Sequence, residues 1–241
     1  MVDRASLRLS ASLLLIGVVV SVVADMLHPP GANDYRAAFT AYANSQVWTA
    51  VHLAQFVGIA LILAGLMVLF FALGVSEGAP RWLGLFGAVS AGVALALAAV
   101  AYAVDGVALK QAVDAWASAP AAEKATQFAD AQTVRWLEWG LRSYLDFVFG
   151  LALVLMATTV VWTARIPRPV GYLMGASGLC FVAVGWVLGT EGFAMVGVVP
   201  SDAAQALLLA WIVWLLVVAW RMREGAEPSG PVDKPPTVET V

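Results

Sequence analysis

One long apolar stretch, residues 136–162, limits most strongly what this chain can fold into. It can cross a bilayer as an α-helix, and its last 16 residues carry no charge. Those residues rise only about 24 Å, less than the roughly 30 Å of hydrocarbon. Just before them, Glu138, Arg142 and Asp146 are spaced four and four and share one helical face. We therefore expect Asp146 inside or at the edge of the apolar slab, where ionisable groups are costly and mark candidate sites.

The composition indicates that the whole chain, and not only this stretch, belongs to a membrane protein. Of its 241 residues, 61% are hydrophobic and 12% are charged, whereas soluble domains average about 25% charged residues. We predict an all-α membrane protein in which residues 1–223 form one bundle and residues 224–241 a disordered cytoplasmic tail. The predicted spans are about 7–27, 47–73, 82–104, 136–162, 170–189 and 203–220. A signal peptide cleaved before Asp25 is the alternative for the first span; a retained helix is preferred because it gives an even helix count.

The orientation follows from the distribution of basic residues. With both termini inside, eight basic residues lie on the inner side and four on the outer side. The composition is typical of a high-GC bacterium, so we expect a multi-pass protein of the bacterial plasma membrane with both termini cytoplasmic. The inner set is Arg4, Arg8, Arg81, Arg165, Arg168, Arg221, Arg223 and Lys234, and the outer set is Arg36, Lys110, Lys124 and Arg135.

Two connecting segments and one internal similarity complete the predicted architecture. Residues 31–46 are predicted as a polar loop. Residues 109–133 are predicted as two short amphipathic helices, broken at Pro120, that lie on the membrane surface. Spans two and three resemble spans four and five: residues 58–63 (GIALIL) align with residues 150–155 (GLALVL), and Pro-Arg turns and acid-Gly exits also align. This predicts a parallel duplication of two helix hairpins.

The polar residues near the span ends gather on the predicted outer side, while arginines dominate the inner ends. Five acids there face one fixed cation, Arg142, so protons, protonated histidines or a bound cation must balance them. We predict a pocket near this side that binds a cation or a small polar or lipidic ligand. Its candidate residues are His52, Gln55, Asp105, Glu138, Arg142, Asp146 and Glu191.

Two alternatives stay open. His28, His52 and Glu138, with Asp105 or Glu191, could hold a divalent metal in a membrane-embedded metal-dependent enzyme, and a haem between the two histidines is a variant. No HExxH-type motif accompanies them. Alternatively, the charges of Glu138, Arg142 and Asp146, which we call the ladder, balance one another and hold neighbouring helices together. The protein would then be a scaffold or accessory subunit of a membrane complex.

Other classes of function find little support. The net charge of −3 gives no reason to propose nucleic acid as a partner. The single cysteine, Cys180, cannot form an intrachain disulfide. The expected partners are the lipid bilayer, a small molecule or cation, and another copy of the chain or a membrane complex.

Several short motifs resemble uncharacterised six-span membrane proteins of actinobacteria. They are His28-Pro29, Trp48, His52-Leu53 and Gln55-Phe56, followed by the stretch RWLEWG at residues 135–140. The resemblance covers about residues 8–222 and implies a six-span fold, and it implies no activity.

Overall fold

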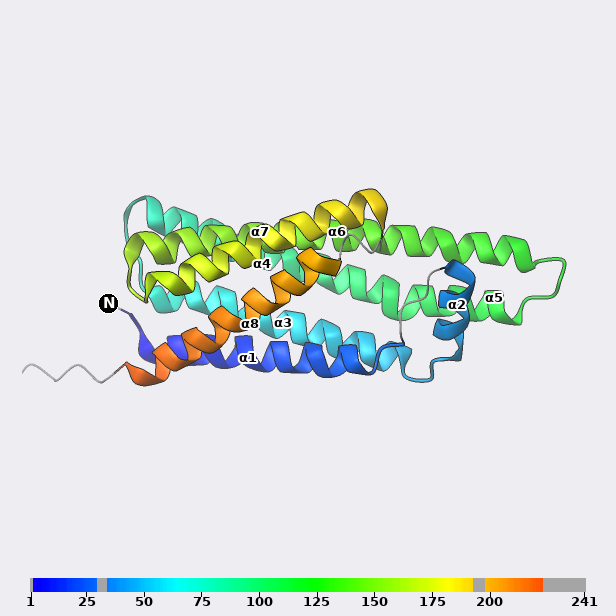
Figure 1. Ribbon diagram of the computed structural model, residues 1–241, viewed down its shortest axis with the longest axis horizontal. Helices are drawn as coiled ribbons and strands as arrows, with labels where there is room; N and C mark the ends of the chain where they lie inside the picture. Colours follow the sequence, from blue (N-terminus) through cyan, green and yellow to red (C-terminus); the bar gives the residue numbers. More distant parts are fainter. Residues whose placement is uncertain (1, 30–33, 193–197, 223–241) are drawn as a thin grey trace, which may run out of the picture.

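The computed structural model describes residues 2–29, 34–192 and 198–222 and is helical throughout its regular elements (Figure 1). The predicted tail, residues 224–241, lies outside the described residues. The helices are α1 (Arg4–Met26), α2 (Tyr35–Asn44), α3 (Trp48–Leu73), α4 (Gly78–Ala103), the π-helix η1 (Val104–Leu109), α5 (Lys110–Ser118), α6 (Lys124–Thr163), α7 (Arg168–Glu191) and α8 (Val198–Arg221).

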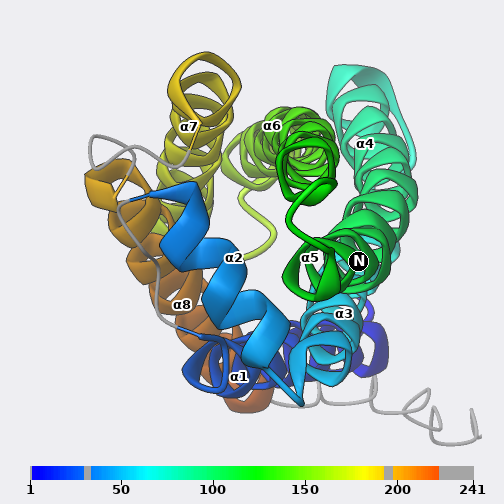
Figure 2. The same ribbon diagram turned by 90° about the vertical axis from the view of Figure 1, so that its right-hand side faces the viewer.

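Within the described part of the chain, six helices are long and apolar enough to cross a membrane, which confirms the predicted all-α, six-span class. They are α1, α3, the continuous α4–η1–α5 helix, α6, α7 and α8. Each packs against the next in chain order, and α8 returns to α1, so the six helices close a ring. Figure 2 shows this ring from one end, with α7, α6 and α4 along one side and α8, α1 and α3 along the other.

The tightest helix contacts in this ring use small residues. On the α1–α3 contact, a Cβ on Gly17 would lie 2.6 Å from the carbonyl oxygen of Gly58. On the α6–α7 contact, Gly150 meets Gly178 in the same way. Small residues let two helix backbones approach closely where lipid supplies no hydrophobic drive for association.

The predicted duplication aligns Gly58 with Gly150, and both glycines do lie at close helix contacts. Their partners differ, however. Gly58 packs on α1, the helix before it, whereas Gly150 packs on α7, the helix after it. The duplication stays a prediction.

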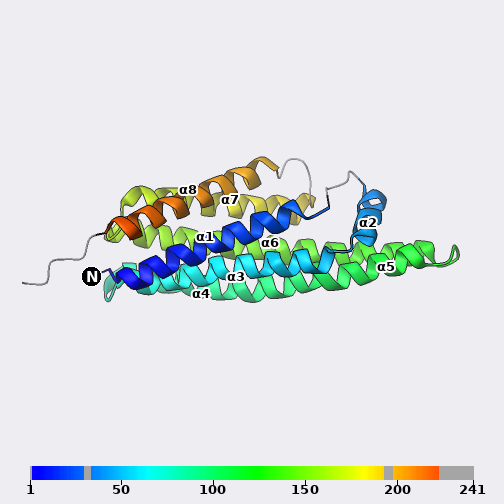
Figure 3. The same cartoon turned by 90° about the horizontal axis from the view of Figure 1, so that it is seen from below.

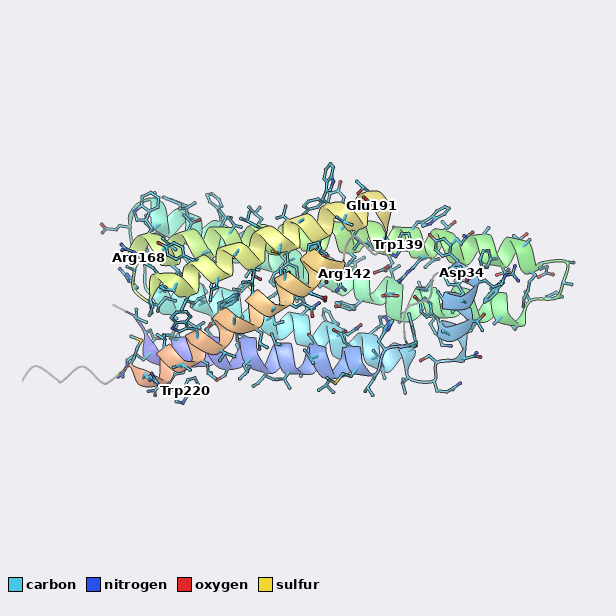
Figure 4. The ribbon with its side chains drawn as sticks, in the orientation of Figure 1. Asp34, Trp139, Arg142, Arg168, Glu191 and Trp220 are labelled. Carbon is cyan, nitrogen blue, oxygen red and sulfur yellow. The ribbon has the colours of Figure 1, made fainter. Side chains whose placement is uncertain are left out.

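Both described ends of the chain lie at the same end of the ring, where arginines bind helix carbonyl groups. Arg4 donates to Met222 O, and Arg8 Nε donates to Ala219 O at 3.2 Å. Arg165 Nη1 donates to the carbonyls of Leu73 and Gly74 at the end of α3. Cations at helix C-termini offset the negative end of the helix dipole. Figure 4 labels Arg168 and Trp220 at this end.

At the other end of the ring, the longest helix, α6, extends beyond the ends of the shorter helices. α6 has 40 residues and is therefore about 60 Å long, twice the hydrocarbon thickness of roughly 30 Å. The segment predicted as two surface helices has its break near Pro120, between α5 and α6. Both helices, however, run along the bundle and continue α4 and α6 instead of lying across them (Figure 3).

The expected polar loop at residues 31–46 contains a helix, α2, which corrects that prediction. Asp34 caps it by accepting a hydrogen bond from Ala37 N at 2.8 Å, a favoured N-cap arrangement. Its apolar face buries Phe39 and Tyr42 against Trp116 of α5. We call α2, α5 and residues 124–135 of α6 the cap.

Candidate functional site

Four charged or ionisable side chains meet where the cap joins the ring, and we call His52, Asp105, Arg135 and Glu138 the ion-pair cluster. His52 Nε2 lies 3.1 Å from Asp105 Oδ2. Arg135 Nη1 bridges two acids, at 3.3 Å from Asp105 Oδ1 and 3.1 Å from Glu138 Oε2. The side chains are 2–13% exposed. Buried charges of this kind are tolerated only when they are paired.

The π-helix η1 places Asp105 in this cluster. A π-helix adds one residue to a turn, and such insertions often occur at functional sites. The tip of α3 binds two carbonyl groups of η1: Trp48 Nε1 donates to Asp105 O and Thr49 Oγ1 donates to Gly106 O, both at 2.8 Å. A Cβ on Gly106 would lie 2.7 Å from His52 Cβ, so only glycine lets His52 approach this closely.

Aromatic rings enclose the cluster on the cap side. The Arg135 guanidinium lies 5.6 Å from the ring centroid of Tyr42 and 5.7 Å from that of Trp139, within the range of cation–π attraction. His28 lies just after α1. The centroid of its ring is 5.0 Å from that of the Trp48 ring and 5.3 Å from that of the His52 ring. Burial lowers the pKa of His28, and the Pro29 carbonyl, which accepts from Nδ1 at 2.7 Å, partly opposes that shift.

The geometry does not favour a metal among these residues. Within residues 2–29, 34–192 and 198–222, no three His, Cys, Asp or Glu side chains are grouped as metal ligands. The ring nitrogens of His52 are occupied by Trp48 O, 2.8 Å from Nδ1, and by Asp105. Glu138 faces Arg135, which competes with a cation for the same oxygen.

A separate cavity of about 300 Å³ lies inside the ring, with residues of all six membrane helices in its lining. This volume is at the small end of the range for ligand pockets. Polar side chains line one part of it: Asp25, Gln55, Tyr102, Arg142, Asp146 and Gln205. Apolar side chains line most of the rest, and they include Val18, Ile59, Ile62, Phe149, Phe181 and Leu208; the hydroxyl-bearing Ser21 also lies in this part.

The polar and apolar parts are separated along the helix axes. On α1, apolar Val18 lies seven residues before Asp25, which is about 10 Å along the helix. On α3, which runs in the opposite direction, Gln55 precedes Ile62 by the same interval. On α6, Arg142 precedes Phe149. The polar part therefore lies toward the cap and the apolar part deeper in the ring.

Arg142 is the one cation among the described residues that line this cavity. Its Nη1 donates to the Tyr102 hydroxyl at 3.0 Å, and its Nε lies 4.0 Å from Asp146 Oδ1. A guanidinium has five N–H donors, so several remain for a ligand. Figure 4 shows Arg142 near the first turns of α8. Opposite it, Gln55 Nε2 donates to Asp25 Oδ1 at 2.5 Å.

The structure divides the sequence-predicted site residues between these two places. His52, Asp105 and Glu138 belong to the ion-pair cluster, whereas Gln55, Arg142 and Asp146 line the cavity. The ladder Glu138–Arg142–Asp146 is therefore split, because Glu138 pairs with Arg135. Glu191 joins neither group: it is exposed at the end of α7.

Sequence reasoning missed three contributors. Arg135 was assigned to an outer connection, although its spacing of three from Glu138 is the spacing of a helical ion pair. Trp48 is buried, and its indole donates a hydrogen bond to η1, a role that the sequence does not indicate. Tyr102, which holds Arg142, gave no charge signal in the sequence.

No protein-family model, no curated protein and no solved structure matches the chain. Of the resemblance to actinobacterial membrane proteins, the structure supports the six-span helical shape.

Proposed function

We propose that this protein binds a small amphipathic molecule in the cavity inside its helix ring. The observation that carries the proposal is the division of the cavity lining, polar toward the cap and apolar deeper in the ring. A ligand with a polar head and a short apolar body matches that division, because each part meets a surface of its own kind.

The polar part of the cavity favours an uncharged head that both accepts and donates hydrogen bonds. The Arg142 guanidinium offers donors, while the carboxylates of Asp25 and Asp146 offer acceptors. A hydroxyl or amide head satisfies both. A carboxylate head would oppose the two acids, and an ammonium head would oppose Arg142.

The arrangement of α1 and α8 supports entry of the ligand from the lipid. The two helices are joined near the termini, where Arg8 bonds Ala219 O, and they diverge toward the cap (Figure 1). The cavity residues Val22 of α1 and Leu209 of α8 lie in this diverging part and are 41% and 44% exposed. An apolar molecule dissolved in the bilayer reaches the cavity here without crossing water.

The test uses the purified protein in lipid nanodiscs and three eight-carbon probes: 1-octanol, octanoate and octylamine. We expect 1-octanol to raise the unfolding temperature most, because a bound ligand stabilises the folded state by mass action. If none of the three probes raises the unfolding temperature, the proposal is overturned.

A matched pair of variants on α8 controls for effects of the probes on the bilayer. Ala206 lines the cavity, whereas Ala210 on the same helix is exposed and does not. Ala206→Phe should remove the stabilisation by 1-octanol, and Ala210→Phe should keep it. Equal responses of the two variants would show that the probe acts through the lipid.

We also propose the bacterial plasma membrane as the location, with both termini in the cytoplasm. The arginines near the described termini support this orientation, because basic residues favour the cytoplasmic side. The cavity would then open toward the outer leaflet. A reporter that fluoresces only in the cytoplasm, fused after residue 241, tests the orientation, and a dark fusion would reverse it.

A further inference from the structure

A second hollow lies between the last turns of α6 and the first turns of α7, and we call it the α6–α7 groove. Its volume is about 600 Å³. The described lining of the cavity inside the ring shares no residue with it. Its lining residues are Val154, Ala157, Thr158, Val161 and Trp162 of α6, and Gly171, Tyr172, Gly175, Ala176 and Leu179 of α7.

The floor of the α6–α7 groove is formed by small and apolar residues. On α6, Val154, Ala157 and Val161 recur at intervals of three and four and therefore share one helical face. A Cβ on Gly175 of α7 would lie 3.3 Å from Ala157 Cβ, so the two helices are close beneath the groove. The hydroxyl of Thr158 is already paired, because it donates to Val154 O at 2.8 Å. The floor therefore offers a surface for a hydrocarbon chain.

The α6–α7 groove is open to lipid along its length. Trp162, Tyr172 and Leu179 are 60%, 60% and 64% exposed, although α6 and α7 are long and apolar enough to cross a membrane. Trp and Tyr are enriched where the bilayer meets water, so the end of the groove at Trp162 and Tyr172 lies near the lipid headgroups. Leu179 is seven residues beyond Tyr172 on α7, which places it about 10 Å further along the helix and deeper in the bilayer.

A guanidinium group lies beside the headgroup end of the groove. Arg168 is the first residue of α7, and its Nε donates to the carbonyl oxygen of the groove residue Val161 at 3.3 Å. Figure 4 labels it where α6 and α7 connect. A guanidinium has five N–H donors, and the described residues accept one hydrogen bond from Arg168.

The charge of Arg168 is also unbalanced within the protein. No acid among residues 2–29, 34–192 and 198–222 forms an ion pair with it. Arg165, three residues earlier, differs because it donates to two carbonyl groups at the end of α3. Arg168 can therefore bind an anion at the headgroup end of the groove.

We propose that the α6–α7 groove binds a phospholipid with an anionic headgroup, with one acyl chain along the apolar lining and the phosphate paired with Arg168. Guanidinium groups bind phosphate through charge-assisted and often bidentate hydrogen bonds. A zwitterionic headgroup brings a cation of its own to the same place, whereas an anionic headgroup brings none, so the anionic lipid is preferred. The site does not depend on the ligand proposed for the cavity inside the ring.

The first experiment measures which lipid stays bound to the whole protein. The protein is released from nanodiscs that contain equal amounts of phosphatidylglycerol and phosphatidylcholine, and native mass spectrometry counts the retained lipids. We expect more phosphatidylglycerol than phosphatidylcholine. Arg168→Gln should reduce the retained phosphatidylglycerol roughly fivefold, the effect of one basic residue at an anionic membrane surface.

The control for Arg168 is an arginine at the same end of the ring. Arg81 of α4 is exposed and does not line the groove, so Arg81→Gln makes the same change in net charge and should leave the retained phosphatidylglycerol unchanged. Equal losses in the two variants, or no loss in Arg168→Gln, would overturn the proposed site.

A second pair of variants tests the position of the acyl chain. Ala176 lines the groove, whereas Ala183 on the same helix is exposed and does not. Ala176→Phe fills the groove and should reduce the retained phosphatidylglycerol, while Ala183→Phe should retain it. Equal retention by the two variants would show that the acyl chain does not occupy the groove.

The second experiment locates the lipid in a protein whose groove and Arg168 are unchanged. Phosphatidylglycerol with bromine atoms on an acyl chain quenches the fluorescence of the tryptophans that it contacts. Subtracting the signal of Trp162→Phe isolates Trp162 of the groove, and Trp186→Phe isolates Trp186, which is exposed further along α7. Brominated phosphatidylglycerol should quench Trp162 more than brominated phosphatidylcholine does, and the two lipids should quench Trp186 equally. Equal quenching of Trp162 by the two lipids would overturn the site, whatever the variants of the first experiment show.

Discussion

Gly150 of α6 packs directly against the backbone of Gly178 of α7. A Cβ atom on Gly150 would lie 2.5 Å from Gly178 O, and one on Gly178 would lie 2.7 Å from Gly150 O. The nearest side-chain atoms, Val182 Cγ2 at 2.8 Å from the first position and Leu153 Cβ at 2.9 Å from the second, are farther away than these oxygens, so backbone contact limits how closely the helices approach here.

The first prediction follows from this contact. Gly150→Ala should lower the free energy of unfolding by about 1–3 kcal/mol, the usual cost of overpacking, because a backbone oxygen cannot move aside as a side-chain end can. Titration with a denaturing detergent measures it. Gly140 of the same helix has open space around its Cβ position, so Gly140→Ala should be neutral or slightly stabilising. Equal effects of the two substitutions would contradict the close packing of α6 and α7.

The second prediction concerns Arg135, which holds two acids in the ion-pair cluster. Arg135→Gln leaves Asp105 and Glu138 without their shared cation. Removing one partner of a buried ion pair typically costs about 3–5 kcal/mol, so we expect a loss of that order in the free energy of unfolding.

Lys110 provides the comparison for Arg135. It pairs with Asp114 at 2.7 Å, but the acid is 50% exposed. Surface pairs contribute only about 0–1 kcal/mol, so Lys110→Gln should have a small effect. A small effect of Arg135→Gln would mean that water reaches the cluster.

The third prediction is a pH dependence of stability that arises from His28. Burial lowers the pKa of this imidazole, so the unfolded chain binds a proton more readily than the folded one. The contribution of His28 to stability is therefore present above the ordinary pKa of about 6.5 and is lost as the pH falls through the lower, folded value. Between pH 7.5 and pH 5, the unfolding temperature of the unchanged protein should decrease relative to that of His28→Gln. An identical pH dependence in both proteins would assign the effect to other groups.

The sequence predicted the six-span, all-α class because hydropathy and helix length directly report the cost of burying polar backbone in lipid. It did not predict that α4 and α5 form one continuous helix through η1, since a π-helix has no strong sequence signature. It also missed α2. Asp34 is a good N-cap residue, but a helix of 10 residues is marginal in isolation and depends on tertiary packing against Trp116.

The sequence predicted which types of residue form the candidate site better than it predicted how those residues are arranged. Glu138 and Asp146 are eight residues apart on α6. At 100° and 1.5 Å per residue, they differ by about 80° around the helix and 12 Å along it. They therefore reach different neighbours, the cluster and the cavity. The spacing alone did not reveal this division, because it depends on where η1 meets α6.

The fourth prediction tests Arg142 as the group that selects the ligand head. Arg142→Leu removes the cation from the polar part of the cavity and leaves the carboxylates of Asp25 and Asp146. Losing a hydrogen bond from a charged donor costs about 1.5–3 kcal/mol, so the affinity for 1-octanol should fall by roughly ten- to a hundredfold. Octylamine, whose cation no longer opposes Arg142, should become the best of the three probes. Arg36→Leu, an exposed arginine on α2, should leave the order of the probes unchanged. If Arg142→Leu binds the three probes in the original order, Arg142 does not contact the ligand head, and the polar part of the cavity is not where the head binds.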